Sequence, residues 1–175
     1  MTTIPAAEVQ RLKNALPFWL SLGMVPVAVF GALHGGWAVG LLPLYSWGLF
    51  SLLDALTGLN PDNADLQTPE AGLKWYRLIT LIWFPVQFGL LCWLLWYVPQ
   101  AVHLGTGERI VLFFGMGVVS GTIGINYSHE LMHQKPAIER WMADLLLASV
   151  LYSHFRSEHL RVHHLYIGTP RDPVT

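Results

Sequence analysis

The chain has 175 residues, room for one domain, and 53% of them are hydrophobic while only 12% are charged. This charged share is about half that of a typical soluble protein, and 10 basic against 11 acidic residues leave no positive excess for nucleic acid. The composition therefore argues against a disordered chain, a soluble enzyme and a nucleic-acid binder. The single cysteine, Cys92, excludes an internal disulfide and any cysteine-based zinc site.

Three long stretches without charged side chains predict membrane-spanning helices: residues 14–53, 78–107 and 110–129. The first is divided near its middle by a turn at His34-Gly35-Gly36. We expect an all-α integral membrane protein, one membrane domain over residues 1–175, with spans at about 16–33, 37–56, 76–98 and 108–128. Each is long enough to cross a hydrocarbon core of ~30 Å. A cleaved signal peptide fits the first run poorly, because the run is too long and lacks an A-x-A-like site. A bundle of buried soluble helices is the other alternative.

The basic residues predict the orientation of the chain. With a cytoplasmic N-terminus, nine of the ten Lys and Arg residues lie on the cytoplasmic side and only Arg109 lies on the other. The polar, proline-containing segment 60–74 is expected to be a cytoplasmic loop. The histidine-rich C-terminal part is then cytoplasmic as well.

Six of the eight histidines fall between His129 and His164, and five of these form two clusters. His129 and His133 are four residues apart on one helical face, and Gly117 and Gly121 extend the same line, which favours close approach of a neighbouring helix. His159 and His163 repeat the spacing of four, and His164 follows directly. Neutral imidazole is a common ligand of Fe, Zn, Cu and Ni. We therefore predict five metal ligands, for two metals or for one with further ligands: His129, His133, His159, His163 and His164.

The segment between the clusters, Ala137 to Phe155, is predicted to be an interfacial helix. Its first half is charged, with Arg140 and Asp144 at the spacing of an ion pair. Only 145–155 is free of charge, which is too short to cross a membrane. An interfacial or re-entrant helix brings both clusters to the same side. His154, on this segment, is expected to support the site rather than bind metal, as are Glu130 and Glu158, which adjoin predicted ligands.

Two kinds of metal chemistry fit the first cluster. His129-Glu130-Leu131-Met132-His133 satisfies the H-E-x-x-H pattern of zinc peptidases, in which Glu130 is the general base beside a zinc-bound water. That class needs one further ligand, whereas the second cluster offers three. A histidine-rich di-iron site that activates O2 at the membrane surface uses all five.

The sequence resembles the N-terminal half of the alkane 1-monooxygenases, the membrane di-iron hydroxylases of alkanes, within the desaturase and hydroxylase superfamily. Membrane fatty-acid desaturases are similar, but their second motif is H-x-x-H-H, whereas three residues separate His159 from His163. The matching segments are Leu52-Leu53-Asp54-Ala55, Tyr76-Arg77, Asn126 to Lys135 (NYSHELMHQK), Glu139 to Ala143 (ERWMA), Tyr152 to Phe155 (YSHF), Glu158 to His164 (EHLRVHH) and Thr169 to Pro173 (TPRDP).

The resemblance implies two non-haem iron ions, an alkane or other apolar alkyl substrate, O2, and electrons from rubredoxin and its reductase, in the bacterial inner membrane. Two departures bear on this. Met132-His133-Gln134 stands where the family has Gly-His-Lys, and the chain stops at Thr175, before an NYxEHYG-type motif and a final HxxHH motif. We therefore expect a truncated product that hydroxylates nothing alone. A desaturase-type enzyme, a zinc metalloprotease and a non-catalytic membrane protein remain as alternatives.

Overall fold

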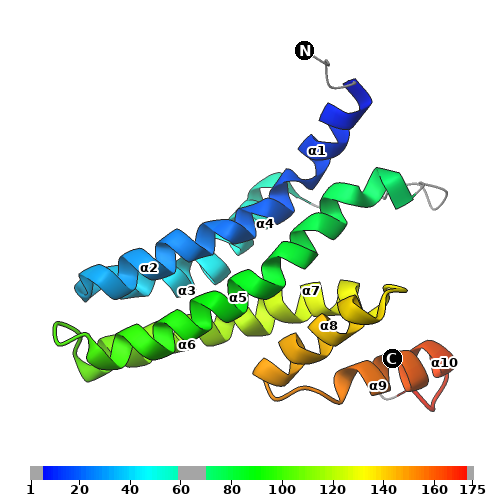
Figure 1. Ribbon diagram of the computed structural model, residues 1–175. Helices are drawn as coiled ribbons and strands as arrows, with labels where there is room; N and C mark the ends of the chain where they lie inside the picture. Colours follow the sequence, from blue (N-terminus) through cyan, green and yellow to red (C-terminus); the bar gives the residue numbers. More distant parts are fainter. Residues whose placement is uncertain (1–5, 59–69, 173–175) are drawn as a thin grey trace. The chain divides into compact units, whose positions relative to one another are not determined.

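The computed structural model describes residues 6–58 and 70–172, and the chain comprises two compact units, Met1–Val119 and Ser120–Thr175 (Figure 1). The regular structure in both units is helical. The expectation of one membrane domain over residues 1–175 stays a prediction, and most of the expected loop 60–74 lies outside the described residues.

Four helical segments are long and apolar enough to cross a membrane, and they confirm the all-α membrane fold expected from the sequence. The four expected spans fall within them, and His34-Gly35-Gly36 forms the expected turn, with positive φ at Gly35 and Gly36. The segments are Glu8–His34, Gly36–Thr57, Lys74–Gln100 and Thr106–Met132.

The first unit contains the helices α1 to α6, several of which are interrupted by tighter or wider turns. Proline explains part of this pattern, because a proline inside a helix lacks the N–H of a main-chain hydrogen bond: Pro17 lies just before a 3₁₀ turn, and Pro43 just before a π-helical turn. The elements are α1 (Ala6–Trp19), η1 (Leu20–Gly23), α2 (Met24–His34), η2 (Gly36–Gly40), α3 (Leu41–Pro43), η3 (Leu44–Leu49), α4 (Phe50–Thr57), η4 (Glu70–Leu73), α5 (Lys74–Gln100) and α6 (Thr106–Val119).

Hydrogen bonds tie these helices together at both ends. Near one end, Lys74 Nζ and Trp75 Nε1 lie 3.2 and 3.0 Å from Glu8 Oε1. At the other end, the Glu108 carboxylate accepts hydrogen bonds from the main-chain N–H groups of Gly36 and Gly105, so it links the turn after α2 to the turn before α6.

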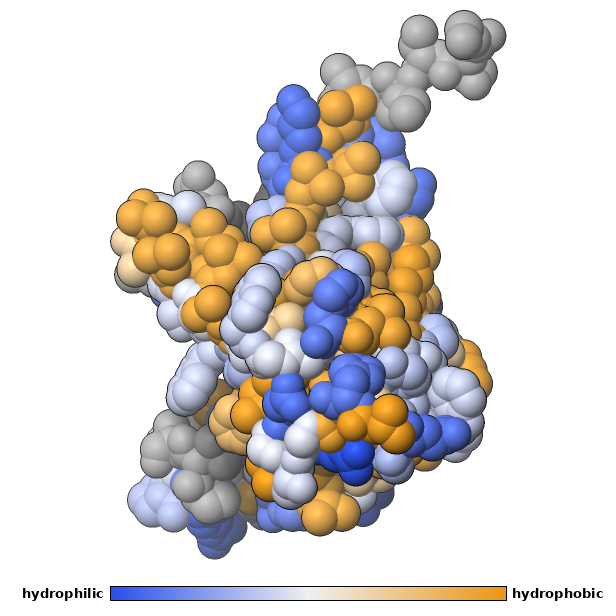
Figure 2. All heavy atoms as spheres, turned by 90° about the vertical axis from the view of Figure 1, so that its left-hand side faces the viewer, coloured by the Kyte–Doolittle hydropathy of each residue, from blue (hydrophilic) through white to orange (hydrophobic). Residues whose placement is uncertain are grey.

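Large apolar side chains are exposed on the first unit, as a lipid environment requires. Trp37, Trp47, Leu56 and Trp96 are each more than 60% exposed. Figure 2 shows apolar side chains reaching the surface over much of the face that it presents. In water such a surface would be an aggregation hazard; in hydrocarbon it is favourable.

The second unit is built around a pair of packed helices, α7 and α8. Ser128 Oγ, fully buried on α7, donates a hydrogen bond to the carbonyl of Ala143 on α8, and Leu131, Leu146 and Leu147 are buried. The helix α8 has 13 residues, about 20 Å, and ends earlier than the expected Phe155. The elements are η5 (Ser120–Gly124), α7 (Ile125–Met132), α8 (Ala137–Ser149), α9 (Phe155–Glu158), η6 (His159–His163) and α10 (His164–Tyr166).

One local prediction is wrong. Arg140 does not pair with Asp144: its guanidinium caps the carbonyls of Gln134 and Lys135, and Asp144 pairs with Arg156 at 2.9 Å. The free carbonyls ahead of α8 compete successfully for Arg140, because an exposed ion pair is worth little.

The helix expected to pack closely on Gly117 and Gly121 is not among the described residues, and a different glycine makes a close contact within the first unit. An added Cβ at Gly117 or Gly121 would meet nothing within 4 Å among the described residues, whereas one at Gly115 would lie 3.0 Å from Pro43 Cδ. The π-helical turn Ser120–Gly124 shifts the helical register between Gly117 and His129, which explains why the line of small residues is not continuous.

Candidate metal centre

The first two candidate ligands lie at the end of α7. His129 is half-buried in its last turn, and His133 caps the helix and is exposed. Their spacing of four brings both rings to one side, with ring centroids 4.8 Å apart. Packing of α7 on α8 holds this end of the helix in place, because Leu131 and Met132, between the two histidines, are buried.

The second group lies on the π-helical turn His159–His163 and on His164, which follows it. Hydrogen bonds from i to i+5 make each turn of a π-helix about one residue wider than an α-helical turn. His164, five residues after His159, therefore comes closest: the two Nε2 atoms are 2.9 Å apart. The prediction was based on the spacing of four between His159 and His163, but the His163 ring lies farther from the His159 ring than the His164 ring does.

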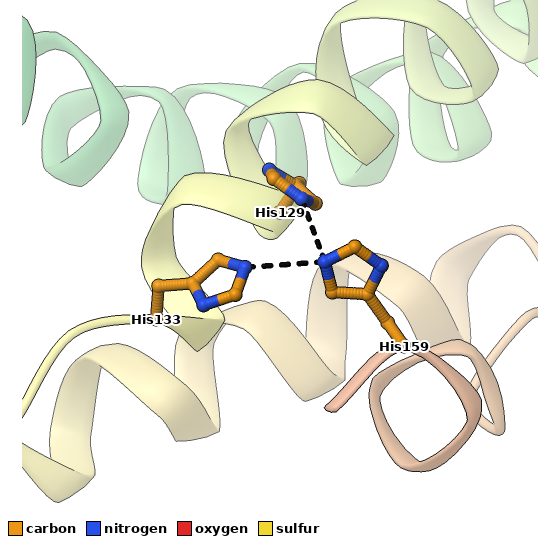
Figure 3. A group of neighbouring side chains, drawn as sticks. All are labelled: His129, His133 and His159. Carbon is orange, nitrogen blue, oxygen red and sulfur yellow. Dashed lines mark hydrogen bonds between the residues drawn. The ribbon is translucent and has the colours of Figure 1, made fainter. Parts of the chain in front are cut away.

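Ring nitrogens from both groups converge on His159 (Figure 3). Its Nε2 lies 2.9 Å from His129 Nε2, 3.2 Å from His133 Nε2 and 2.9 Å from His164 Nε2. Ligand atoms of His129, His133 and His159 all lie within 4.8 Å of one another. The structure thus assembles four of the five predicted ligands, from segments 26 to 35 positions apart in the sequence, around one nitrogen.

This arrangement fits a metal ion better than a hydrogen-bond network. A ring nitrogen of a neutral imidazole has one N–H or one lone pair, so His159 Nε2 cannot satisfy three neighbouring nitrogens at once. A cation accepts lone pairs from several imidazoles together. With metal–nitrogen bonds of about 2.1 Å, ligands at right angles lie about 3.0 Å apart, which matches the three separations from His159 Nε2 of 2.9, 3.2 and 2.9 Å.

The surroundings of His133 and His159 lower the pKa of both rings. Partial burial and the neighbouring histidines, first His129 and then His164, lower the pKa of His159 to about 4. The same causes lower the pKa of His133, against a smaller opposing effect of Glu130. Both rings are therefore neutral near pH 7, and a neutral imidazole has the lone pair that a metal requires.

His163 has a different environment. Its partner is Asp172, which the sequence motifs did not identify as a site residue. Its Nδ1 lies 2.8 Å from Asp172 Oδ2, and its ring centroid lies 5.3 Å from that of His159. Asp172 is 4% exposed although its side chain is a carboxyl group. Its place in Thr169-Pro170-Arg171-Asp172-Pro173 was visible in the sequence, but no spacing rule links it to a residue nine positions earlier.

The three expected supporting residues are placed unequally. Glu130 Oε1 lies 3.3 Å from His129 Nδ1, the ring nitrogen opposite the one facing the cluster. His154 and Glu158 lie against each other, 3.8 Å apart, and both are exposed. The structure therefore brings Glu130 to a ligand and leaves His154 and Glu158 outside the group around His159.

Comparison with known proteins agrees with this histidine-rich centre. A family model described as fatty acid desaturase matches residues 109–175, which include all five histidines. Alkane 1-monooxygenase 1 of Pseudomonas aeruginosa is 38% identical over 176 residues, covering 96% of this chain and 46% of the relative. The chain is a relative of the alkane 1-monooxygenases.

Other alkane 1-monooxygenases match to a similar extent. Alkane 1-monooxygenase 2 of Pseudomonas aeruginosa is 32% identical over 97% of this chain and 47% of its own length. The alkane 1-monooxygenase of Pseudomonas putida is 34% identical over 90% of this chain and 39% of its own length. The chain thus spans less than half the length of these relatives, and the resemblance predicted from its motifs is confirmed.

Proposed function

We propose that this chain carries part of the metal centre of a membrane di-iron enzyme that hydroxylates the terminal carbon of alkanes. The observation that carries the proposal is the convergence of His129, His133 and His164 on His159 in a chain with four membrane-spanning helices. Bound iron would activate O2. One oxygen atom would be inserted into a terminal C–H bond, and the other would take up two electrons and two protons to form water.

The protein's own residues would hold and expose the metals. His129, His133, His159, His163 and His164 would supply nitrogen ligands, and Glu130 would accept a hydrogen bond from Nδ1 of His129, which would direct its Nε2 to the metal. Exposure of His133 and His164 supports delivery of electrons by a soluble donor, for which we propose rubredoxin with its reductase. An apolar substrate would enter from the lipid around the spanning helices.

We further propose that the chain lies in the bacterial inner membrane with its N-terminus and histidines in the cytoplasm. Nine of ten basic residues fall on that side of the proposed topology. The zinc peptidase alternative receives less support, because Glu130 contacts the ring nitrogen of His129 that faces away from His159. A general base would need to lie beside the metal-bound water.

Metal binding tests the first step. The protein is purified in detergent, titrated anaerobically with Fe(II), and compared with His159→Ala and the control His154→Ala. In a complete four-ligand metal site, worth about 10–16 kcal/mol, each ligand contributes about 3 kcal/mol, so His159→Ala should bind Fe(II) about 100-fold more weakly than the unaltered chain. His154→Ala should bind as the unaltered protein does. Equal binding by all three would refute a centre at His159.

Hydroxylation tests the second step. The chain alone is expected to bind iron weakly and to produce no alcohol, because five imidazoles are few for two irons. A chimera in which these 175 residues replace the matching part of Alkane 1-monooxygenase 1 of Pseudomonas aeruginosa would be supplied with rubredoxin, its reductase, NADH and octane. We expect 1-octanol by gas chromatography, and none from the His159→Ala chimera. An iron-loaded chimera that produces no alcohol would refute the proposed activity.

A further inference from the structure

A buried carboxylate lies against the predicted ligand that is farthest from the cluster centre. Asp172 Oδ2 is 2.8 Å from His163 Nδ1, and the Asp172 side chain has 0% of its surface exposed, against 22% for His163. Removing a carboxylate from water is costly unless donors satisfy it. An ionised carboxylate can only accept a hydrogen bond, and a ring nitrogen that donates to it must carry the proton.

The backbone after the second cluster is shaped to deliver this carboxylate. Helix α10 ends at Tyr166, and Gly168 then adopts φ +77, a left-handed conformation that reverses the chain. Gly168 lies within the first of two successive turns, in which Thr169 N donates to the Tyr166 carbonyl at 2.9 Å and Asp172 N donates to the Thr169 carbonyl at 3.1 Å. Hydrogen-bonded turns restrict where the Asp172 side chain can lie.

We propose that Asp172 is a positioning residue that holds His163 in the Nδ1–H tautomer and so reserves its Nε2 for a metal ion. The inference rests on the proposed function as far as the metal is concerned. A histidine with a free ring can present either nitrogen, and the acceptor on one nitrogen decides which is left. A negative acceptor also makes the imidazole a stronger ligand, and losing such a partner typically weakens metal binding 10–100-fold.

The tautomer can be measured without any metal. Two-bond ¹H–¹⁵N correlation spectra of the protein with ¹⁵N-labelled histidine distinguish Nδ1–H from Nε2–H, and the His163 signal is assigned as the one missing in His163→Ala. We expect Nδ1–H at His163 in the unaltered protein and a mixture in Asp172→Ala. An Nε2–H tautomer in the unaltered protein would overturn the proposal, whether or not the chain binds iron.

Metal affinity supplies the second measurement, with Co(II) as the probe because its visible spectrum reports ligand geometry. Asp172→Ala should bind Co(II) 10–100-fold more weakly, and Asp172→Asn should lose less, because its amide oxygen still accepts from Nδ1–H. The matched control is Asp144→Ala, which removes a carboxylate of the same unit that pairs with Arg156. It should stay within about twofold of the unaltered protein.

A double-mutant cycle separates positioning from general support of the fold. If Asp172 acts through His163, Asp172→Ala should have no further effect on Co(II) affinity in a His163→Ala background. Equal losses in both backgrounds would overturn the proposal, as would unchanged affinity in Asp172→Ala. Should Asp172→Ala not fold, Asp172→Asn enters the same cycle. Absence of Co(II) binding in the unaltered protein would refute the proposed function, while the tautomer would still decide the role of Asp172.

Discussion

Close packing between α2 and the turn η2 makes Gly31 a sensitive position in the first unit. A Cβ added there would lie 2.9 Å from the Ala38 carbonyl oxygen, 3.3 Å from Val39 Cα and 3.4 Å from Leu112 Cδ2. Two of these atoms belong to the main chain of a turn that Glu108 ties to the rest of the unit. They cannot rotate away as a side-chain tip could, so Gly31→Ala should force the two segments apart.

The expected change in the free energy of unfolding follows from two opposing effects. Overpacking of this kind costs about 1–3 kcal/mol, whereas alanine is favoured over glycine inside a helix by about 1 kcal/mol. Gly89 on α5 is the matched control, since it too lies within a spanning helix and an added Cβ meets nothing within 4 Å. Gly89→Ala should be neutral or stabilising, and Gly31→Ala should unfold about 1–3 kcal/mol more easily than Gly89→Ala.

Reversible unfolding in mixed micelles, with SDS as denaturant and far-UV circular dichroism as the probe, measures this difference. The comparison between two glycine-to-alanine changes cancels most of the effect on the unfolded chain. Equal stability of the two variants would refute the reasoning, because it would mean that Ala38 and Val39 can move at little cost.

Three further predictions concern packing, topology and the alternative chemistry. Leu131→Ala, at a fully buried site, should destabilise by about 2–4 kcal/mol in the same assay, whereas Leu165→Ala, at a site 67% exposed, should change little. In a background without Cys92, a membrane-impermeant thiol reagent applied to intact cells should label a cysteine placed at Val102 but not one at Lys135; the reverse pattern would contradict the proposed orientation. Glu130→Gln keeps an oxygen that can accept from His129, so its metal affinity should fall less than about tenfold, and loss of a peptidase activity in this variant would favour the zinc alternative.

The membrane fold could be predicted from the sequence because it depends on composition along the chain. Stretches without charge identify spanning helices directly, and the two glycines of the turn at residues 35 and 36 mark where the first two separate. Local register was harder to predict. The sequence placed Gly117 and His129 on one line only by assuming an unbroken α-helix, and the π-helical turn at Ser120–Gly124 removes that assumption.

For the site, too, the types of residue could be predicted from the sequence, but not all of their contacts. Histidine is uncommon enough that six between residues 129 and 164 indicated a metal centre, and three of the other four predicted ligands meet around His159. Contacts between side chains distant in sequence could not be predicted in this way. Asp172 reaches His163 because of a chain reversal at Gly168, and Asp144 pairs with Arg156 rather than with its helical neighbour.

The wide turn at His159–His163 has a consequence for how the spacing of these histidines can vary. A turn with i to i+5 hydrogen bonds contains one residue more than an α-helical turn, so it is equivalent to a single-residue insertion absorbed inside a helix. Deleting Val162 would restore α-helical winding and move the present His164 to four positions after His159, the spacing of a regular helix. The two rings would remain neighbours, and His163 would stand three positions after His159, which a regular helix also keeps near the same face. The wide turn thus lets spacings of four and five residues do what spacings of three and four do in a regular helix, with His164 facing the cluster around His159 and His163 the carboxylate of Asp172.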